Sequence, residues 1–312
     1  MDKLLNILQN INKVFIGKEE VISKIMTGIL CGGHLLIEDV PGVGKTTLAK
    51  VIAKTLGCSF SRIQFTPDLM PADIIGISVY DKGRDEFVYR PGPVMSQIVL
   101  ADEINRTSPR TQSSLLEAME EGQVSVDGVT YKLPDPFIVI ATQNPVEFEG
   151  TYPLPEAQLD RFMLRITIGY PGSEDERRIL RLPAGKNLLQ SVEAVITPKE
   201  LLQLQRQAKE VHLAGSLESY IIELARASRN HADVLLGISP RGAKHLYLAV
   251  KGLAFIKGRN YVLPDDIKEM LAFVFAHRII LKPEALLKGI TALDIIAEIA
   301  ERTPVPVMVD GR

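Results

Sequence analysis

The sequence has no tryptophan, few other aromatic residues and only two cysteines. Cys31 and Cys58 form no C-x-x-C pair, so the sequence predicts neither a disulfide nor a cysteine metal site, and two reduced, buried thiols are the expected state. The five histidines are scattered without the spacing of metal ligands, and no zinc site is predicted. Chemistry based on thiols or zinc is therefore not expected.

Long apolar runs and an excess of one charge are also absent. No run approaches the roughly 20 apolar residues that span a bilayer, and the N-terminus lacks the cationic stretch and apolar block of a signal peptide. With 36 basic and 38 acidic side chains among 312 residues, the chain has no global positive field to hold nucleic acid. These absences predict a cytoplasmic globular protein without membrane insertion, and nucleic acid is an unexpected partner.

Short apolar runs alternate with helical patterns in the first half of the chain. This alternation is typical of a parallel sheet covered by helices on both faces. The predicted strands are His34–Glu38, Ser61–Phe65, Gln97–Asp102, Phe137–Thr142 and Met163–Ile168. Helices are expected at Thr46–Leu56, between an N-cap at Ser108 and a stop at Gly122, and at the N-terminus, where Leu4, Leu5, Leu8 and Ile11 share one face.

Two segments rich in turn residues predict hairpins inserted into this α/β pattern. Residues 76–92 turn around positions 82–85, and residues 123–133 carry an Asp127-Gly128 turn. After residue 171 only helical patterns follow, near 198–211, 217–230, 240–257, 264–276 and 293–301. We therefore predict an α/β core over residues 1–185 and a smaller all-helical domain over 186–312, with the linker near 182–189.

The stretch Asp39–Thr46 nearly matches G-x-x-x-x-G-K-[ST], the loop that cradles nucleotide phosphates. Backbone N–H groups of such a loop converge on phosphate oxygens, and the following helix adds its partial positive charge. Lys45 is predicted to reach the β- and γ-phosphates, and the Thr46 hydroxyl to bind Mg²⁺. The predicted phosphate-binding residues are Pro41, Gly42, Val43, Gly44, Lys45, Thr46 and Thr47.

Asp39 stands where the motif has its first glycine. A side chain is tolerated there if the strand leaves its end with a negative φ. The Asp39 carboxylate is expected to point away from the phosphates, toward backbone N–H groups of the loop.

Two other predicted strands end in polar side chains. Asp102 and Glu103 end a buried strand, and two acids seldom do so without a cation to hold, because buried charge is costly. Asp102 suits Mg²⁺ bound through water, and Glu103 suits a general base that polarises the attacking water. Asn144 is placed to hydrogen-bond the γ-phosphate or that water. The alternatives are two solvated acids that cap the next helix, and ordinary Asn-Pro turn chemistry.

The order of the phrases GVGKT, VLADEINR, ATQNP, LPEAQLDRF and SPRG resembles the MoxR family of AAA+ ATPases over essentially the whole chain. The resemblance implies a three-layer P-loop core with a helical lid, as in the related magnesium-chelatase ATPase subunit. It also implies ATP and Mg²⁺ as cofactors and a homo-oligomeric ring, most often a hexamer. Protein clients, often with a von Willebrand factor A domain, are implied as partners.

The same resemblance assigns roles to single residues. It implies that Arg161 is an arginine finger for the neighbouring subunit's γ-phosphate, and that Arg241 contacts the phosphates from the lid as a second sensor. Near a helix C-terminus, Arg161 could instead be a cation that complements the helix dipole. Arg241 is expected in the first turn of a helix, where a cation is disfavoured unless an anion is near, and a solvated arginine is the alternative.

Further residues carry weaker implications of the resemblance. Arg106 is placed at the subunit interface, and Gln64 is expected to restrain Glu103. Val14, Ile16 and Gly17 are matched to the segment that packs on adenine, with core packing as the alternative.

The resemblance implies ATP hydrolysis coupled to remodelling, maturation or metal-cofactor insertion of partner proteins. An ATP-gated scaffold without hydrolysis is an alternative, against which Glu103 and Asn144 count. A DNA motor of the related helicase group would need basic hairpins, whereas both hairpins here mix acids and bases. A small-molecule kinase would have no use for Arg161 acting on a neighbour.

Overall fold

The computed structural model describes residues 2–145, 150–181 and 188–306. Its centre is a five-stranded parallel sheet in the order β2-β5-β8-β1-β9. The strands are β1 (Leu35–Glu38), β2 (Phe60–Gln64), β5 (Ile98–Asp102), β8 (Ile138–Gln143) and β9 (Leu164–Ile166). All five strands predicted from the apolar runs are therefore present, within one or two residues of the expected ends.

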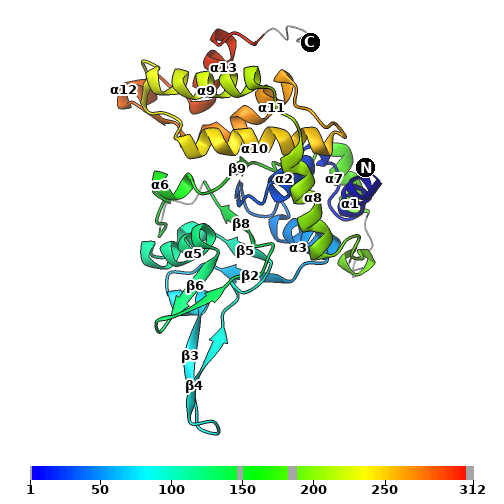
Figure 1. The fold of residues 1–312 in the computed structure, drawn as a ribbon, viewed down its shortest axis with the longest axis vertical. Helices are drawn as coiled ribbons and strands as arrows, with labels where there is room; N and C mark the ends of the chain where they lie inside the picture. Colours follow the sequence, from blue (N-terminus) through cyan, green and yellow to red (C-terminus); the bar gives the residue numbers. More distant parts are fainter. Residues whose placement is uncertain (1, 146–149, 182–187, 307–312) are drawn as a thin grey trace.

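The two faces of the sheet are buried against different layers. Alternate side chains point to opposite faces of a strand, and Leu35 and Ile37 belong to one hydrophobic cluster while Leu36 belongs to another. The first cluster packs against α1 (Asp2–Asn12), α2 (Glu19–Leu30), α3 (Lys45–Thr55) and the C-terminal helices. The second packs against α4 (Pro71–Ile75) and α5 (Pro109–Glu121). The core is thus the three-layer α/β fold that the sequence predicted (Figure 1).

Helix α1 buries most of the predicted face, since Leu4 and Ile11 lie in the core and Leu8 packs against it, but Leu5 does not belong to that face. Leu4, Ile7 and Ile11 are buried, but Leu5 is 56% exposed. A helix packs the residues that follow a spacing of three and four, and Leu5 lies beside that stripe. Helix α5 follows the prediction closely, because Ser108 caps it through Thr111 N and Gly122 ends it in the left-handed conformation.

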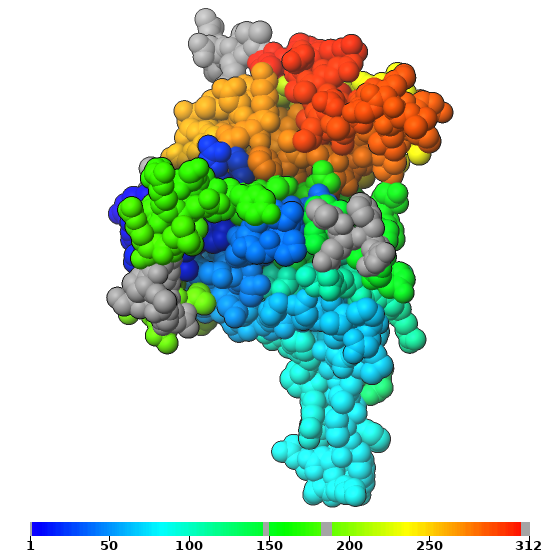
Figure 2. Space-filling view, turned by 180° about the vertical axis from the view of Figure 1, so that it is seen from behind, coloured from blue at the N-terminus to red at the C-terminus, as the bar shows by residue number. Residues whose placement is uncertain are grey.

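Both predicted hairpins are present. The strands β6 (Gln123–Val126) and β7 (Val129–Lys132) join through Asp127 and Gly128, which both have the positive φ of a type I′ turn. The longer ribbon of β3 (Gly76–Asp81) and β4 (Glu86–Pro91) projects from the body as an arm (Figures 1 and 2). Tyr89 of the arm stacks on Tyr131 of the shorter hairpin, with ring centroids 4.0 Å apart. The two hairpins therefore contact each other near their bases.

The C-terminal part is mainly helical and covers one side of the core (Figure 1). Its principal helices are α8 (Pro198–Glu210), α9 (Gly215–Asn230), α10 (Pro240–Ile256), α11 (Pro264–Phe275) and α13 (Ala292–Arg302), with short α12 (Pro283–Leu287) between the last two. The expectation of helices alone needs one correction, since β10 (Val234–Leu236) and β11 (Ile280–Leu281) form a small antiparallel pair. Strands of two or three residues are too short for their alternation to be read from sequence.

Two shorter helices flank the last strand of the core: α6 (Glu156–Leu159) precedes β9, and α7 (Ser173–Leu180) follows it and leads toward the C-terminal helices. The predicted boundary near residue 185 lies within 182–187, outside the described residues, and stays a prediction. Within the described ranges, no helix is long and apolar enough to cross a bilayer.

Helix α10 lies against α2 at a glycine. A Cβ atom added at Gly252 would stand 2.5 Å from the Cys31 Sγ and 3.2 Å from the Thr27 carbonyl oxygen. The two helices can therefore approach closely only because position 252 has no side chain.

We expect Gly252→Ala to lower the free energy of unfolding by about 1–3 kcal/mol, because an added methyl overpacks this contact. Gly215→Ala is the matched control, since a Cβ at Gly215 meets nothing within 4 Å. Urea unfolding monitored by circular dichroism measures both changes. Equal stability of the two variants would contradict a close α2–α10 contact at residue 252.

Candidate nucleotide site

The loop between β1 and α3 has the conformation of a phosphate cradle. Gly42 and Gly44 have φ values of +88° and +87°, which glycine adopts without strain. A Cβ at Gly42 would meet nothing within 4 Å, so the loop backbone faces open space there. Helix α3 begins at Lys45 without an acid in its first turn or a hydrogen bond from a capping side chain of the described residues. Its N-terminal N–H groups are therefore suited to an anion.

The predicted Mg²⁺ residues lie next to each other. The Thr46 hydroxyl is 3.4 Å from Asp102 Oδ2, although 56 positions separate the two residues. Lys45 Nζ donates to the Asp39 carbonyl oxygen at 2.7 Å, which folds its side chain back over the loop. The loop and the first acid of the pair thus meet at the carboxyl ends of β1 and β5.

The Asp39 carboxylate points away from the cradle, as expected. Oδ1 accepts a hydrogen bond from Val40 N at 2.8 Å, within the loop. Oδ2 accepts from Ile168 N at 2.7 Å and Gly169 N at 2.6 Å, just after β9. Asp39 therefore ties the start of the loop to the chain that leaves the edge strand, a contact that the sequence did not indicate.

A hydrogen-bonded network holds the acid pair at the end of β5. The Thr142 hydroxyl of β8 donates to Asp102 Oδ1 at 2.6 Å and accepts from Glu103 N at 2.9 Å. Glu103 itself has a φ of +59°, unusual for a residue with a side chain and a source of local strain. Backbone strain of this kind fixes the direction in which the Glu103 carboxylate leaves the strand.

Gln64 contacts Glu103, as the resemblance implied. Its Nε2 donates to Glu103 Oε2 at 2.8 Å, and Arg106 Nε lies 3.3 Å from the same oxygen. Sequence reasoning missed Arg62, whose Nε and Nη2 donate to Asp102 Oδ2 at 2.9 and 2.7 Å. Its position two residues before Gln64, on the same face of β2, was the signal that could have revealed it.

Asn144 follows β8 directly and is buried. Because β8 lies between β5 and β1 in the sheet, Asn144 stands between the acid pair and the phosphate loop. Residues 146–149, just beyond it, lie outside the described ranges.

An apolar cavity of about 390 Å³ opens beside the loop. Val14 and Ile16, two residues of the segment expected near adenine, line it together with Gly42–Gly44 and Thr47. Phe15, not singled out from the sequence, lines it as well. Gly17 does not line the cavity and instead packs on Asp175, whose Oδ2 would stand 2.0 Å from a Cβ at position 17.

Arg161 and Arg241 lie together near the amino-terminal ends of the strands, whereas the phosphate loop and the acid pair lie at the carboxyl ends. Arg161 Nη2 is 2.7 Å from Glu120 Oε2, and Arg241 Nη2 pairs with the other oxygen of the same carboxylate. The cavity around them, of about 560 Å³, is lined by Gly33 and His34 before β1 and by Met163 before β9. The phosphate loop follows β1, so the structure does not bring Arg241 to the loop of its own chain. The expected role of Arg241 as a second sensor therefore stays a prediction, and the nucleotide it would contact is not the one bound by the loop of its own chain.

Buried polar contacts fix the lid to the segment that carries Arg161. The Arg278 side chain is only 2% exposed, and its Nε donates to Asp160 Oδ1 at 2.7 Å. Burial lowers the pKa of Arg278 to about 10, an effect that Asp160 partly offsets. Ser239 Oγ also contacts Asp160 at 3.1 Å while it caps α10 through Gly242 N. The start of α10, with Arg241, is therefore held beside Arg161.

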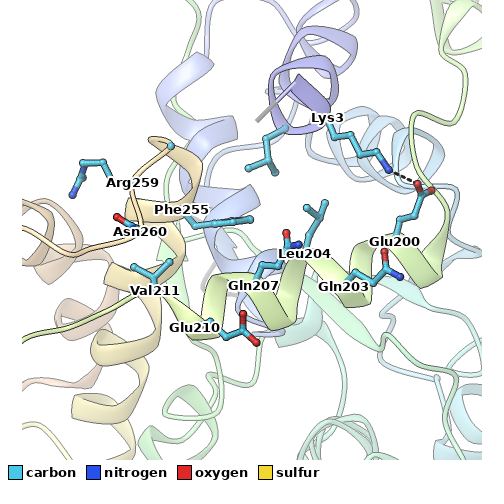
Figure 3. A pocket seen from close by; sticks show the side chains of 12 residues that line it. Lys3, Glu200, Gln203, Leu204, Gln207, Glu210, Val211, Phe255, Arg259 and Asn260 are labelled. Atoms are coloured by element: carbon cyan, nitrogen blue, oxygen red, sulfur yellow. Dashed lines mark hydrogen bonds and ion pairs between the residues drawn. The ribbon is translucent and has the colours of Figure 1, made fainter.

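A third cavity, of about 600 Å³, lies between α1, α8 and the residues after α10 (Figure 3). Lys3 donates to Glu200 across it. None of the residues that the sequence analysis assigned to nucleotide chemistry lines this cavity. We therefore do not assign this cavity to the nucleotide, although it is larger than the cavity beside the phosphate loop.

Comparison with known proteins agrees with this geometry. Residues 34–164 match the "ATPase family associated with various cellular activities (AAA)", and residues 226–299 match the AAA lid domain. The chaperone MoxR1 of Mycobacterium tuberculosis is 40% identical over 310 residues, which cover 95% of this chain and 80% of MoxR1. The chain belongs to the MoxR family of AAA ATPases.

Two further relatives extend over nearly the whole length of this MoxR protein. Protein YeaC of Bacillus subtilis is 50% identical over 300 residues, 96% of this chain and 94% of YeaC. The 2.00 Å crystal structure of a candidate ATPase from Cytophaga hutchinsonii superposes with a TM-score of 0.92 at 42% identity, over 98% of this chain and 96% of that one. The MoxR fold, lid included, is therefore matched by an experimental structure.

The residues present fit the ATP and Mg²⁺ that a MoxR ATPase implies. Gly42 and Gly44 both have the positive φ of a phosphate loop, and the backbone at Gly42 faces open space. Thr46 and Asp102 supply the hydroxyl and carboxylate oxygens that Mg²⁺ accepts alongside phosphate and water. Among the described residues, no group of three or more His, Cys, Asp or Glu side chains could hold a metal ion.

We expect Asp39→Gly to retain ATP binding but to lower the free energy of unfolding by about 1–3 kcal/mol, because the N–H groups of Ile168 and Gly169 lose their acceptor. Titration with a fluorescent ATP analogue and urea unfolding measure the two effects. Asp39→Asn, whose amide oxygen can still accept, is the milder control. Complete loss of nucleotide binding at unchanged stability would show that Asp39 contacts the nucleotide.

Proposed function

We propose that this MoxR protein hydrolyses MgATP within a homo-oligomeric ring and uses the energy to remodel protein clients. One observation carries the proposal. The phosphate loop and acid pair lie at the carboxyl ends of the strands, whereas Arg161 and Arg241 lie near the amino ends, paired with Glu120. A single chain therefore lacks cations that the family resemblance assigns to the γ-phosphate, and a neighbour can supply them.

The chain's own residues have distinct roles in the proposed reaction. Lys45 and the loop N–H groups bind the phosphates, while Thr46 and Asp102 hold the metal. When bound, Mg²⁺ neutralises charge that develops on the phosphate oxygens. Glu103 takes the proton of the attacking water, and Asn144 orients that water or the γ-phosphate. Gln64, hydrogen-bonded to Glu103 Oε2, positions this base and restrains it until ATP is bound.

Arg161 and Arg241 act, in this proposal, on the nucleotide of the adjacent subunit. Guanidinium groups bind phosphate oxygens bidentately and stabilise transition-state charge. Because both arginines are needed by a neighbour, activity requires assembly. Any closed ring of subunits gives every site its arginines, and a hexamer is the ring size that the family resemblance implies.

Support for a protein client comes from the MoxR1 relative, which is named a chaperone. Clients with a von Willebrand factor A domain, and maturation or metal-cofactor insertion in the cytoplasm, remain the specific expectation from the family resemblance. The arm of β3 and β4 is a candidate for client contact, because Tyr80 and Phe87 are exposed and stack edge to face near its end.

The charges of the arm disfavour a DNA motor. Arg84 lies 3.9 Å from Asp81 and 4.0 Å from Glu86, so acids of the same ribbon offset its charge. A surface that tracks a phosphate backbone needs unpaired cations.

The ATPase rate as a function of protein concentration tests the proposal. We expect wild-type activity per subunit to rise with concentration, and Arg161→Ala and Arg241→Ala each to lose about 100-fold or more at every concentration. Glu103→Gln should bind ATP but lose about 100-fold of the rate. Arg226→Ala, which removes an exposed arginine of α9, is the control and should match wild type. A rate per subunit that is independent of concentration and survives Arg161→Ala would rule out a shared site.

A further inference from the structure

Glu120 is the point at which the two arginines meet. Its two carboxylate oxygens are divided between them, Oε2 to Arg161 at 2.7 Å and Oε1 to Arg241. The three residues come from different elements: Glu120 from the last turn of α5, Arg161 from the segment after α6, and Arg241 from the first turn of α10. One carboxylate therefore orders cations from both the core and the lid.

Glu120 lies at a position in α5 where a carboxylate is electrostatically unfavourable without these partners. The C-terminal end of a helix carries a partial negative charge, which disfavours an acid in the last turn. Helix α5 has no basic residue in that turn, and Glu121 follows with a second acid. Arg161 and Arg241 provide the compensating positive charge from outside the helix.

Glu120 satisfies the two guanidinium groups only in part. Arg161 Nε is buried and has no hydrogen-bond partner among the described residues. The Arg161 and Arg241 side chains are 28% and 40% exposed, and both line the 560 Å³ cavity together with Lys244. Arg241 Nη1 also lies 3.9 Å from Asp160 Oδ2, a carboxylate that already pairs with the buried Arg278. Cations therefore outnumber carboxylates at a surface that solutes can reach, an arrangement with capacity for a further anion.

We propose that Glu120 is a positioning residue that holds Arg161 and Arg241 side by side until the γ-phosphate of the adjacent subunit displaces it. The inference rests on the proposed function, in which both arginines complete the neighbouring site. A carboxylate and a phosphate offer the same kind of anionic oxygen to guanidinium donors, so the two compete. Glu120 keeps the arginines ordered in a free subunit. Because it competes with the phosphate, it also raises the protein concentration at which subunits assemble into active sites.

The competition predicts a specific effect of removing the charge. Glu120→Gln keeps the size of the side chain but weakens its hold on both arginines. The phosphate of the neighbour then has less to displace. A partly exposed ion pair shifts an equilibrium by a factor of about 1.5 to 5, so the loss of two should lower the protein concentration for half-maximal ATPase activity by about fivefold.

A mixing experiment isolates the pair of subunits concerned. The donor carries Lys45→Ala, which removes its own nucleotide site but leaves its arginines intact. The acceptor carries Arg161→Ala and Arg241→Ala, which leave its nucleotide site but remove its arginines. Activity in the mixture then comes from acceptor sites completed by donor arginines, and donor concentration is varied at fixed acceptor and MgATP.

Glu120→Gln is placed in one subunit type at a time. In the donor it should lower the half-maximal concentration about fivefold, whereas in the acceptor, which has no arginines for Glu120 to hold, it should change nothing. Glu121→Gln in the donor removes the same charge one residue away and should leave the value unchanged. Glu120→Asp, which keeps the charge but shortens the reach, should give about a twofold decrease.

The outcomes separate the two proposals. If the mixture of donor and acceptor with Glu120 intact is inactive although each subunit melts like wild type, the shared site is wrong and the role of Glu120 is wrong with it. If the mixture is active but Glu120→Gln in the donor leaves the half-maximal concentration unchanged or raises it, the role of Glu120 alone is overturned. Should Glu120→Gln fail to fold, the Glu120→Asp donor decides, and an unchanged value overturns the inference.

Discussion

The candidate nucleotide site depends on the hydrogen bonds and the ion pair of the Asp102 carboxylate. Its two oxygens bind Thr142 of β8, Arg62 of β2 and Thr46 of α3, so that elements distant in sequence meet at one group. A buried carboxylate is tolerated only when such partners compensate its charge and its hydrogen bonds. Thr142 in turn accepts from Glu103 N. The network that supplies the buried Asp102 carboxylate with hydrogen-bond partners therefore also places the proposed base beside the loop.

Helix α5 connects the carboxyl ends of the strands to the amino ends. It begins at Ser108, five residues after Glu103, and its last turn presents Glu120 to Arg161 and Arg241. The same helix leads through Gly122 into β6 and β7, where Tyr131 stacks on Tyr89 of the arm. In the proposed mechanism, a neighbour's phosphate that draws the arginines from Glu120 alters the contacts of the helix end that leads into the β6–β7 hairpin. The nucleotide of one subunit can thereby influence the arm of the next.

The parts of the structure that the sequence predicted are those fixed by neighbouring residues. The Ser108 cap, the Asp127-Gly128 turn and the loop glycines each need a backbone conformation that only a few residue types favour. Contacts that depend on tertiary packing were not predictable in the same way. The Arg62–Asp102 pair requires knowledge that β2 lies beside β5, and the position of Arg241 depends on how the lid docks. The site roles assigned from the family resemblance remain predictions, whereas the adjacency of Thr46 and Asp102 and of Gln64 and Glu103 is observed.

The buried Arg278–Asp160 ion pair determines with which part of the core the lid moves. Arg278 donates to Asp160 and to the carbonyl oxygens of Asp160 and Phe162, on both sides of Arg161. Breaking a buried, hydrogen-bonded ion pair is costly, since the remaining charge loses its partner. The start of α10 should therefore move with the Arg161 segment rather than with the phosphate loop of its own chain. In the proposed mechanism, ATP-dependent motion then arises at the junction between subunits, where the lid and arginines of one chain would meet the nucleotide of another.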